Sequence, residues 1–420
     1  MSRGSRTGRP IRPARHCRGC DRAPAQRSTT VEPRSARRPA RRREMRASRS
    51  PARTRDGESA SVGLAAVATV SPAWRFAGSD AGARLHEPIH ATEQPMQHDS
   101  ANAAGADDCA HRVAGAHYRR LVEAARRLDA ITTAVVHPCD ERSLEGALEA
   151  ARLGLIKPVL VGPLDKIRRT AEAAACPLGD FELVDAPHSH AAAEAAVALA
   201  RGGKVEALMK GALHTDELMA AIVDRANGLR TERRMSHVFA LDVPTYAKPL
   251  FITDAAINIE PDLMEKRDIV QNAIDLAHAL AIERPKVAVL SAIETINPAI
   301  ASTLDAAALC KMLDRGQISG ALIDGPLAFD NAISAEAAES KGIRSEVAGD
   351  SDILVVPDLV SGNMLVKQLI YLSGAIAAGI VLGARVPVML TSRADDLEAR
   401  LASAALAVLH AHRVRHRAPA

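Results

Sequence analysis

Aromatic residues are scarce in this chain of 420 residues, where they make up only 2% of the sequence. Proteins that bind single-stranded nucleic acid stack bases on aromatic side chains, so the composition argues against such a surface. The chain also lacks a run of 18 uninterrupted apolar residues. Residues 374–391 come closest, but Arg385 and Pro387 interrupt them. We therefore expect short strands in this region and no membrane-spanning helix.

The six cysteines provide neither a disulfide framework nor a recognisable zinc site. Cys17 and Cys20 form a single Cys-x-x-Cys pair, with no second pair at zinc-ligand spacing. No His-x-x-x-His or Glu-x-x-His pair lies on a clear helical face. We therefore expect a protein of the reducing cytoplasm that holds no metal ion.

Charge is distributed unevenly along the chain. Residues 1–100 contain 20 arginines and nine acidic residues but no lysine, whereas the remainder carries 34 basic and 41 acidic residues. No apolar period persists near the start, and such a segment cannot bury enough surface to become ordered. We expect residues 1–110 to be a disordered Arg- and Pro-rich extension. The change of composition at Met96 makes this methionine a candidate for the true start.

From about residue 114, short apolar runs alternate with helical patterns, as in β-α-β units with parallel strands. We expect an α/β protein with two parallel-sheet domains, over residues 114–235 and 236–395, that face each other across a cleft. A closing helix over residues 396–420 should pack back on the first domain. The expected strands are 132–137, 157–161, 181–184, 205–209, 237–241, 250–253, 286–290, 320–323, 353–356, 380–382 and 388–390.

Polar residues follow three of the apolar runs. These segments are residues 253–258 (TDAAIN), 324–331 (DGPLAFDN) and 391–396 (TSRADD). Open α/β sheets bind ligands outside the carboxyl ends of their parallel strands, so we expect the three segments to meet in the cleft. The first two segments predict four substrate-binding residues: Asp254, Asn258, Asp324 and Asn331.

Two further segments carry cationic groups that suit an anionic substrate. Lys210 and Gly211 follow an expected strand, and Thr215 can cap the next helix, although a plain strand–turn–helix connection would have the same pattern. Arg230 lies in an arginine-rich segment, residues 228–237 (GLRTERRMSH). Arginine suits bidentate phosphate contacts, but a solvated turn between domains would explain this segment equally well.

Ser392 and Arg393 follow the last apolar strand and precede a helix. Their hydroxyl and guanidinium groups could face the cleft, while Ser392 could equally be a helix cap. No Gly-x-Ser-x-Gly elbow surrounds Ser392, so the sequence does not indicate an activated serine nucleophile.

Over about residues 125–415 the chain resembles the phosphate acetyltransferase/phosphate butyryltransferase family. The segments GLRT, ITDAAIN and LTSRAD look closer to the butyryl branch and to the acyltransferase half of enoyl-CoA hydratase fusions. The matching segments are VLVGP (159–163), LMKGALHTDELM (208–219), GLRT…RMSHV (228–238), PLFITDAAINIEPDL (249–263), IDGPLAFDNAIS (323–334), ILVVPDLVSGNML (353–365) and PVMLTSRAD (387–395).

This resemblance implies a homodimer with two α/β domains around a cleft, similar to isocitrate and isopropylmalate dehydrogenases. It implies the conversion of a short-chain acyl-CoA and phosphate to an acyl phosphate and CoA, without a cofactor. The acetyl branch has a Ser-Arg pair that matches Ser392 and Arg393, for transition-state stabilisation and for phosphate or CoA binding. Its proposed base for the CoA thiol is an aspartate seven residues after the serine, where this chain has Ala399.

Two other functions stay open at this point. A metal- and NAD-dependent decarboxylating dehydrogenase of the same architecture would need Mg²⁺ or Mn²⁺ and a Tyr–Lys pair. The three tyrosines, at positions 118, 246 and 371, offer no convincing pair. The other alternative is a protein that binds RNA or a membrane surface through its Arg-rich extension, in which the remainder of the chain has no catalytic activity.

The composition of the extension leads to a first prediction. A chain shortened to begin at Met96 should keep its melting temperature and its acyl-transfer turnover, because residues 1–95 show no burial pattern. Thermal unfolding and enzyme assays of the two chain lengths would check this. A fall of more than a few degrees in melting temperature, or a loss of turnover, would show that the extension contributes to the folded enzyme.

Overall fold

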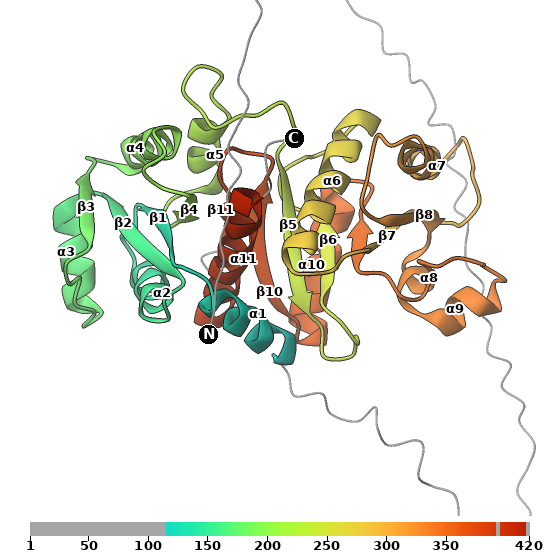
Figure 1. Cartoon of the computed structure of the whole chain (residues 1–420), viewed down its shortest axis with the longest axis horizontal. Helices are drawn as coiled ribbons and strands as arrows, with labels where there is room; N and C mark the ends of the chain where they lie inside the picture. Colours follow the sequence, from blue (N-terminus) through green and yellow to red (C-terminus); the bar gives the residue numbers. More distant parts are fainter. Residues whose placement is uncertain (1–114, 392–394, 417–420) are drawn as a thin grey trace, which may run out of the picture. The chain divides into compact units, whose positions relative to one another are not determined.

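The computed structural model describes residues 115–391 and 395–416, and these residues build one mixed sheet (Figure 1). The expected extension over residues 1–110 lies outside the described residues. Across the sheet the strand order is β3-β2-β1-β4-β11-β10-β5-β6-β9-β7-β8. The strands are β1 (Ile131–Val136), β2 (Ile156–Gly162), β3 (Glu182–Asp185), β4 (Ala207–Lys210), β5 (Ser236–Asp242), β6 (Leu250–Thr253), β7 (Lys286–Leu290), β8 (Leu322–Leu327), β9 (Ile353–Val355), β10 (Ile376–Leu382) and β11 (Val388–Met389).

The sheet has a group of parallel strands on each side, and we call these groups the first and the second block. In the first block β1 pairs with β2 and β4, β2 with β3, and β4 with β11. In the second block β9 pairs with β6 and β7, and β7 with β8. Between the blocks β10 is antiparallel to β11 and to β5, and β5 is antiparallel to β6. The strands of the second block therefore run opposite to those of the first.

Short connections explain the antiparallel centre, which the sequence analysis did not predict. Residues 243–249 join β5 to β6, and residues 383–387 join β10 to β11. A parallel return needs a crossover of about a dozen residues or more, so these connections permit only antiparallel pairing. The expectation of purely parallel sheets is thus corrected. The sheet continues without a break between residues 114–235 and 236–395, and the expected two-domain layout is not confirmed.

Helices cover both faces of the sheet. On one face α1, α2, α3, α6, α7 and α11 share an apolar cluster with the strands. On the other face α4 and α5 cover the first block, while α8 and α10 cover the second, and α9 packs against α8. The helices are α1 (Ala116–Arg126), α2 (Glu141–Arg152), α3 (Leu164–Ala173), α4 (Ser189–Arg201), α5 (Thr215–Val223), α6 (Leu263–Ala279), α7 (Ala301–Asp314), α8 (Phe329–Ile333), α9 (Ala335–Ser340), α10 (Leu359–Ser373) and α11 (Leu397–His416).

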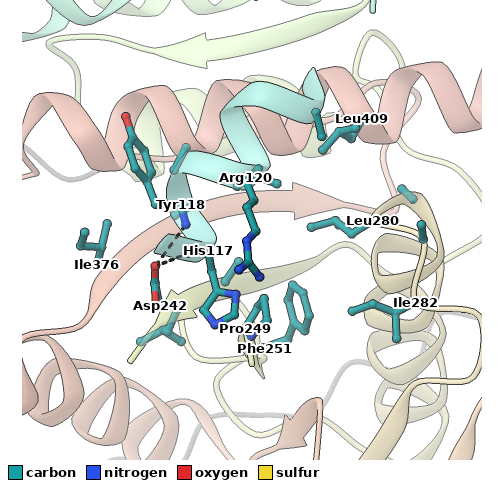
Figure 2. A pocket seen from close by; sticks show the side chains of 18 residues that line it. His117, Tyr118, Arg120, Asp242, Pro249, Phe251, Leu280, Ile282, Ile376 and Leu409 are labelled. Atoms are coloured by element: carbon teal, nitrogen blue, oxygen red, sulfur yellow. Dashed lines mark hydrogen bonds between the residues drawn. The ribbon is translucent and has the colours of Figure 1, made fainter. Parts of the chain in front are cut away.

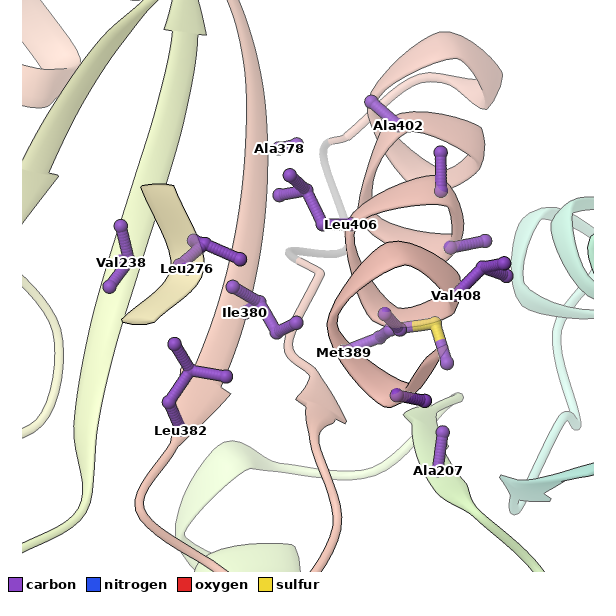
Figure 3. Close-up of a cluster of buried hydrophobic side chains, with 14 of the residues drawn as sticks. Ala207, Val238, Leu276, Ala378, Ile380, Leu382, Met389, Ala402, Leu406 and Val408 are labelled. Atoms are coloured by element: carbon purple, nitrogen blue, oxygen red, sulfur yellow. The ribbon is translucent and has the colours of Figure 1, made fainter. Parts of the chain in front are cut away.

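Helix α11 lies across the junction of the two parallel blocks (Figure 3). Leu406 of α11 points toward β10, where it meets Ala378 and Ile380, and Met389 of β11 lies beside the helix. The same helix also packs against α1, α2 and α6. A helix thus lies where the closing helix was expected, and it contacts elements of both expected domains and not the first alone. None of the described helices is both long enough and apolar enough to cross a membrane.

Candidate active site

The direction in which strands are added reverses between β1 and β4, since β2 lies on one side of β1 and β4 on the other. Open α/β sheets bind ligands in the crevice outside the carboxyl ends of their strands at such a point. A cavity of about 840 Å³ lies at the carboxyl ends of β4 and β11, and we name it the switch-point cavity. Its polar lining includes Lys210, His214, Thr215, Thr391, Asp395 and Asp396, and its apolar lining includes Phe239, Val366, Ile370, Ala377 and Leu390.

Lys210 brings a buried positive charge to this cavity. Its side chain is only 4% exposed, and its Nζ donates to the carbonyl oxygen of Thr391 at 3.2 Å. The chain turns at Gly211, where an added Cβ would lie 2.5 Å from the carbonyl oxygen of Val136. This close approach fixes the end of β4 against β1, so Lys210 is held at the cavity. A buried ammonium group favours an anion beside it.

Of the sequence-predicted site residues, the structure brings Lys210 and Thr215 together at the switch-point cavity. Thr215 is the first residue of α5, and its exposed side chain lies on the cavity lining. Ser392 and Arg393 lie outside the described residues. Their neighbours Thr391 and Asp395, one on each side in the chain, both line the cavity.

The end of β11 is anchored to α11 beside the cavity. The Oγ1 of Thr391 accepts a hydrogen bond from Nη1 of the buried Arg400 at 3.0 Å. Burial lowers the pKa of the Arg400 guanidinium, and Asp140 and Asp395 oppose this shift. Asp396 accepts from the backbone N–H of Ala399 at 2.8 Å and so caps the start of α11. Ala399 lines the cavity at the position where the acetyl branch has its proposed base.

His237 is a cavity residue that the sequence analysis did not select. It is 1% exposed, lies in β5, and packs its ring against Phe239 with 4.2 Å between the ring centroids. Its ring is hydrogen-bonded to the carbonyl oxygen of Leu390, and burial lowers the pKa of the imidazole to about 3. Gly379 makes room for the ring, because a Cβ there would lie 2.8 Å from Nε2 of His237. A histidine inside a strand pattern resembles an ordinary core residue, and its place at the end of the arginine-rich segment, residues 228–237, was the signal that could have selected it.

Asp254 and Asn258 are buried and bind each other instead of lining the cavity. The Nδ2 of Asn258 donates to Oδ2 of Asp254 at 2.6 Å. The Oδ1 of Asp254 accepts from the backbone N–H groups of Ala256 and Ile257 at 3.0 and 3.1 Å. Burial raises the pKa of Asp254, and these hydrogen bonds oppose the shift. The pair holds the loop after β6, and Ala256 of that loop reaches the cavity lining.

The other predicted residues lie away from the switch-point cavity. Asp324 is part of β8, where its Oδ1 accepts from the backbone N–H of Gly325 at 2.8 Å. Asn331 is buried in α8, where it donates to Glu294. Arg230 is exposed and forms an isolated bridge with Ala384.

The three polar segments therefore do not form the expected common cleft. The two blocks run in opposite directions, so β6 and β8 have their carboxyl ends at the sheet edge opposite to those of β4 and β11. Of these three segments, only residues 391–396 contribute polar side chains to the described lining of the switch-point cavity, namely Thr391, Asp395 and Asp396.

A second cavity, of about 420 Å³, lies on the other face of the sheet beneath α1 (Figure 2). Its lining is mostly apolar and includes Phe251, Leu280 and Ile376. At its rim Asp242 accepts from the backbone N–H groups of His117 and Tyr118 at 2.9 and 3.1 Å, which fixes the start of α1. Within the described part of the chain, none of the predicted site residues lines it, so the switch-point cavity is the better candidate.

The switch-point cavity can hold an anion beside an apolar group. Lys210 offers a positive charge, Thr215 and Thr391 offer hydroxyl groups, and the apolar lining suits a short hydrocarbon chain. Within residues 115–391 and 395–416, no group of three or more His, Cys, Asp or Glu side chains is arranged to hold a metal ion.

Comparisons with known proteins agree with this chemistry. A family model described as "Phosphate acetyl/butaryl transferase" matches residues 188–408, which include most of the cavity. Phosphate acetyltransferase of Rhizobium meliloti is 61% identical over 298 residues, which cover 71% of this chain and 94% of that protein. Phosphate butyryltransferase of Clostridium acetobutylicum is 45% identical over 270 residues, covering 64% and 90%. These two identities do not support the expected leaning toward the butyryl branch.

The fold is similar to that of a solved member of the same group. The crystal structure of a branched-chain phosphotransacylase from Enterococcus faecalis V583 matches with a TM-score of 0.59 and 30% identity. The match covers 67% of this chain and 99% of that chain, so it extends over nearly the whole described part.

Proposed function

Because the chain belongs to the phosphate acetyl- and butyryltransferase family, we propose that the switch-point cavity is its active site. The enzyme transfers an acyl group between CoA and phosphate, and this activity replaces the dehydrogenase alternative. The observation that supports the location is the buried Lys210 bonded to Thr391, directly before Ser392 and Arg393. Ser392 and Arg393, which match the family's Ser-Arg pair, thus directly follow a residue that lines a cavity suited to an anion.

The reaction makes three physical demands on such a site. Phosphate must be held beside the thioester so that one of its oxygens can attack the carbonyl carbon. The carbonyl oxygen becomes an oxyanion in the tetrahedral intermediate and needs positive charge or hydrogen-bond donors. The C–S bond then breaks, acyl phosphate forms, and CoA leaves as a thiolate. Cationic and hydroxyl groups at the ends of strands can satisfy the first two demands.

We assign these tasks to the groups at the end of β4 and β11. Lys210 and Arg393 would bind phosphate or CoA, since both can carry positive charge in a partly desolvated cavity. Ser392 would donate to the developing oxyanion, and Thr215 would bind substrate at the start of α5. Asp254 would act indirectly by holding the loop that brings Ala256 to the lining.

The apolar part of the lining provides a place for the acyl chain. Phe239 of β5, Ala377 of β10, and Val366 and Ile370 of α10 line this part of the cavity. We propose a short acyl chain as the substrate, acetyl or butyryl. Each methylene of the chain changes the binding free energy by only about 1–3 kcal/mol, so the exact preference depends on small differences in shape.

We also propose that the enzyme is a cytoplasmic homodimer. Helix α10 supports the dimer, because Val360, Met364, Tyr371 and Leu372 are 62%, 66%, 75% and 81% exposed. Clustered apolar side chains on a surface mark a contact with another protein. Residues on the inner side of the same helix line the switch-point cavity, so a second copy would support the cavity wall.

Light scattering would test the dimer. We expect twice the chain mass for the wild type and a single-chain mass for Met364→Glu, which places a charge in the apolar contact. Val414→Glu, at an exposed position of α11, should keep the wild-type mass. A wild type of single-chain mass would show that the dimer proposal is wrong.

The proposed chemistry needs no metal ion and no redox cofactor. Purified enzyme should therefore release CoA from a C2–C6 acyl-CoA series only when phosphate is present, and EDTA should not change the rate. A thiol-release assay measures this directly and also ranks the acyl chains. Thioester hydrolysis without phosphate, or inactivation by EDTA, would contradict the assignment.

Variants at Ser392 and Arg393 test the catalytic assignment. Ser392→Ala should lower kcat by roughly 10²–10³, the usual effect of losing one oxyanion donor, with little change in KM. Arg393→Lys should raise the KM for phosphate or CoA, because lysine keeps the charge but loses the two-pronged geometry. Ser340→Ala, at an exposed serine of α9, serves as the control. A Ser392→Ala enzyme with normal kcat and a lower melting temperature would identify Ser392 as a helix cap only.

A further inference from the structure

The floor of the switch-point cavity crosses four neighbouring strands of the sheet, β4, β11, β10 and β5. One row of paired residues crosses these strands on the face that α11 covers, and all its members belong to the apolar cluster on that face: Met209, Met389, Ile380 and Val238. Successive side chains of a strand point to opposite faces of a sheet. The next row therefore faces the cavity, and it consists of Lys210, Leu390, Gly379 and Phe239.

This second row places a cation and an aromatic ring at the two ends of the floor. Lys210, Leu390 and Phe239 all line the cavity, while Gly379 adds no side chain. Neighbouring strands lie about 4.8 Å apart, so the Cα atoms of Lys210 and Phe239, three strand spacings apart, are separated by roughly 14 Å. A substrate that binds its anionic part at Lys210 can therefore extend along the floor toward Phe239.

The ring of Phe239 is held in place at its end of the floor. On one side it packs against the ring of His237, with 4.2 Å between the ring centroids. His237 is 1% exposed and is itself hydrogen-bonded to the carbonyl oxygen of Leu390. Phe239 also packs against the apolar cluster of the second block, which includes Leu241 and Ile252. A ligand could displace the ring only by disturbing these contacts.

Apolar side chains of α10 and β10 surround the same end of the cavity. Val366 and Ile370 are four positions apart, so they lie on one face of α10, and both line the cavity. Ala377 of β10 lines it as well. All three residues belong to or pack against the apolar cluster that contacts Phe239. This end of the cavity is thus built for a hydrocarbon group, and Phe239 limits its length.

We propose that Phe239 closes the acyl end of the switch-point cavity and sets the longest acyl chain that the enzyme transfers. The thioester carbonyl reacts at the end of the floor where Lys210 binds the anion, and the acyl chain extends from there toward the ring. A chain that reaches the ring must push it away from His237 and from the apolar cluster, so longer chains are rejected. This inference rests on the proposal that the cavity is the active site.

The chain-length profile of acyl transfer tests this role. With saturating phosphate and acyl-CoA substrates from C2 to C10, the kcat/KM of the wild type should fall sharply at one chain length. Phe239→Ala should move this fall to longer chains, with a gain on the order of 10-fold for the first chain that the wild type rejects. Phe239→Trp should move it to shorter chains. Ratios of kcat/KM between chains do not depend on the folded fraction of a variant, so partial destabilisation cannot hide the shift.

Val238 provides a matched control in the same strand. Its side chain is fully buried in the cluster on the opposite face, so Val238→Ala should lower the melting temperature and leave the chain-length profile unchanged. An unchanged profile in both Phe239→Ala and Phe239→Trp would overturn the proposal. A uniform loss of kcat/KM in Phe239→Ala, with acetyl-CoA affected as much as longer chains, would also overturn it, because the ring would then contact the pantetheine arm of CoA.

The KM for phosphate separates this inference from the cavity proposal. Lys210→Met removes the buried charge and should raise the KM for phosphate without moving the chain-length limit. If it does so while the Phe239 variants keep the wild-type profile, phosphate binds in the cavity and only the role of Phe239 is wrong. If Lys210→Met leaves this KM unchanged and the Phe239 variants also keep the wild-type profile, the cavity is not the active site.

Discussion

The antiparallel pairing of β10 with β5 is the constraint on which the rest of the structure depends. Its register runs from Ile376 opposite Asp242 to Leu382 opposite Ser236, and it joins two parallel blocks of opposite direction into one sheet. Because the strand direction changes here, the carboxyl ends of β4 and β11 lie at one edge of the sheet. The carboxyl ends of the strands in the second block lie at the opposite edge. The switch-point cavity opens at the edge where β4 and β11 end, and α11 closes the other face of the same junction.

The sequence predicted the positions of the strands well, but not their direction. β6 and β7 have the expected bounds, since short apolar runs between turn residues locate buried strands. The direction of β5 and β10 is set by the length of the connections and by the neighbour that each strand finds, which an apolar pattern does not record. The apolar residues of helix α10 show no helical period, because its inner side faces the core and the cavity while its outer side is also apolar.

The sequence predicted two described residues that line the cavity, Lys210 at the end of β4 and Thr215 at the start of α5. Lys210 was selected because a lysine after a strand and before a glycine can bind an anion, although a plain strand–turn–helix connection has the same pattern. Asp254 comes directly after β6, but its carboxylate accepts hydrogen bonds from the N–H groups of its own loop, which is another common use of an aspartate after a strand. The packing of His237 could not be predicted, because it depends on β11 and on Gly379, both more than 140 positions later in the chain.

The cavity residue His237 limits which residues β10 can carry at position 379. Any larger residue at this position would collide with Nε2 of His237 and with the carbonyl oxygen of Leu390. A chain that gains a side chain at 379 must therefore also change or move the ring at position 237 and shift the carbonyl group of Leu390. Substitutions at neighbouring positions that share a partner are not additive. Gly379 keeps open the space that the buried ring of His237 occupies. Substitutions at positions 237 and 379 should therefore depend on each other.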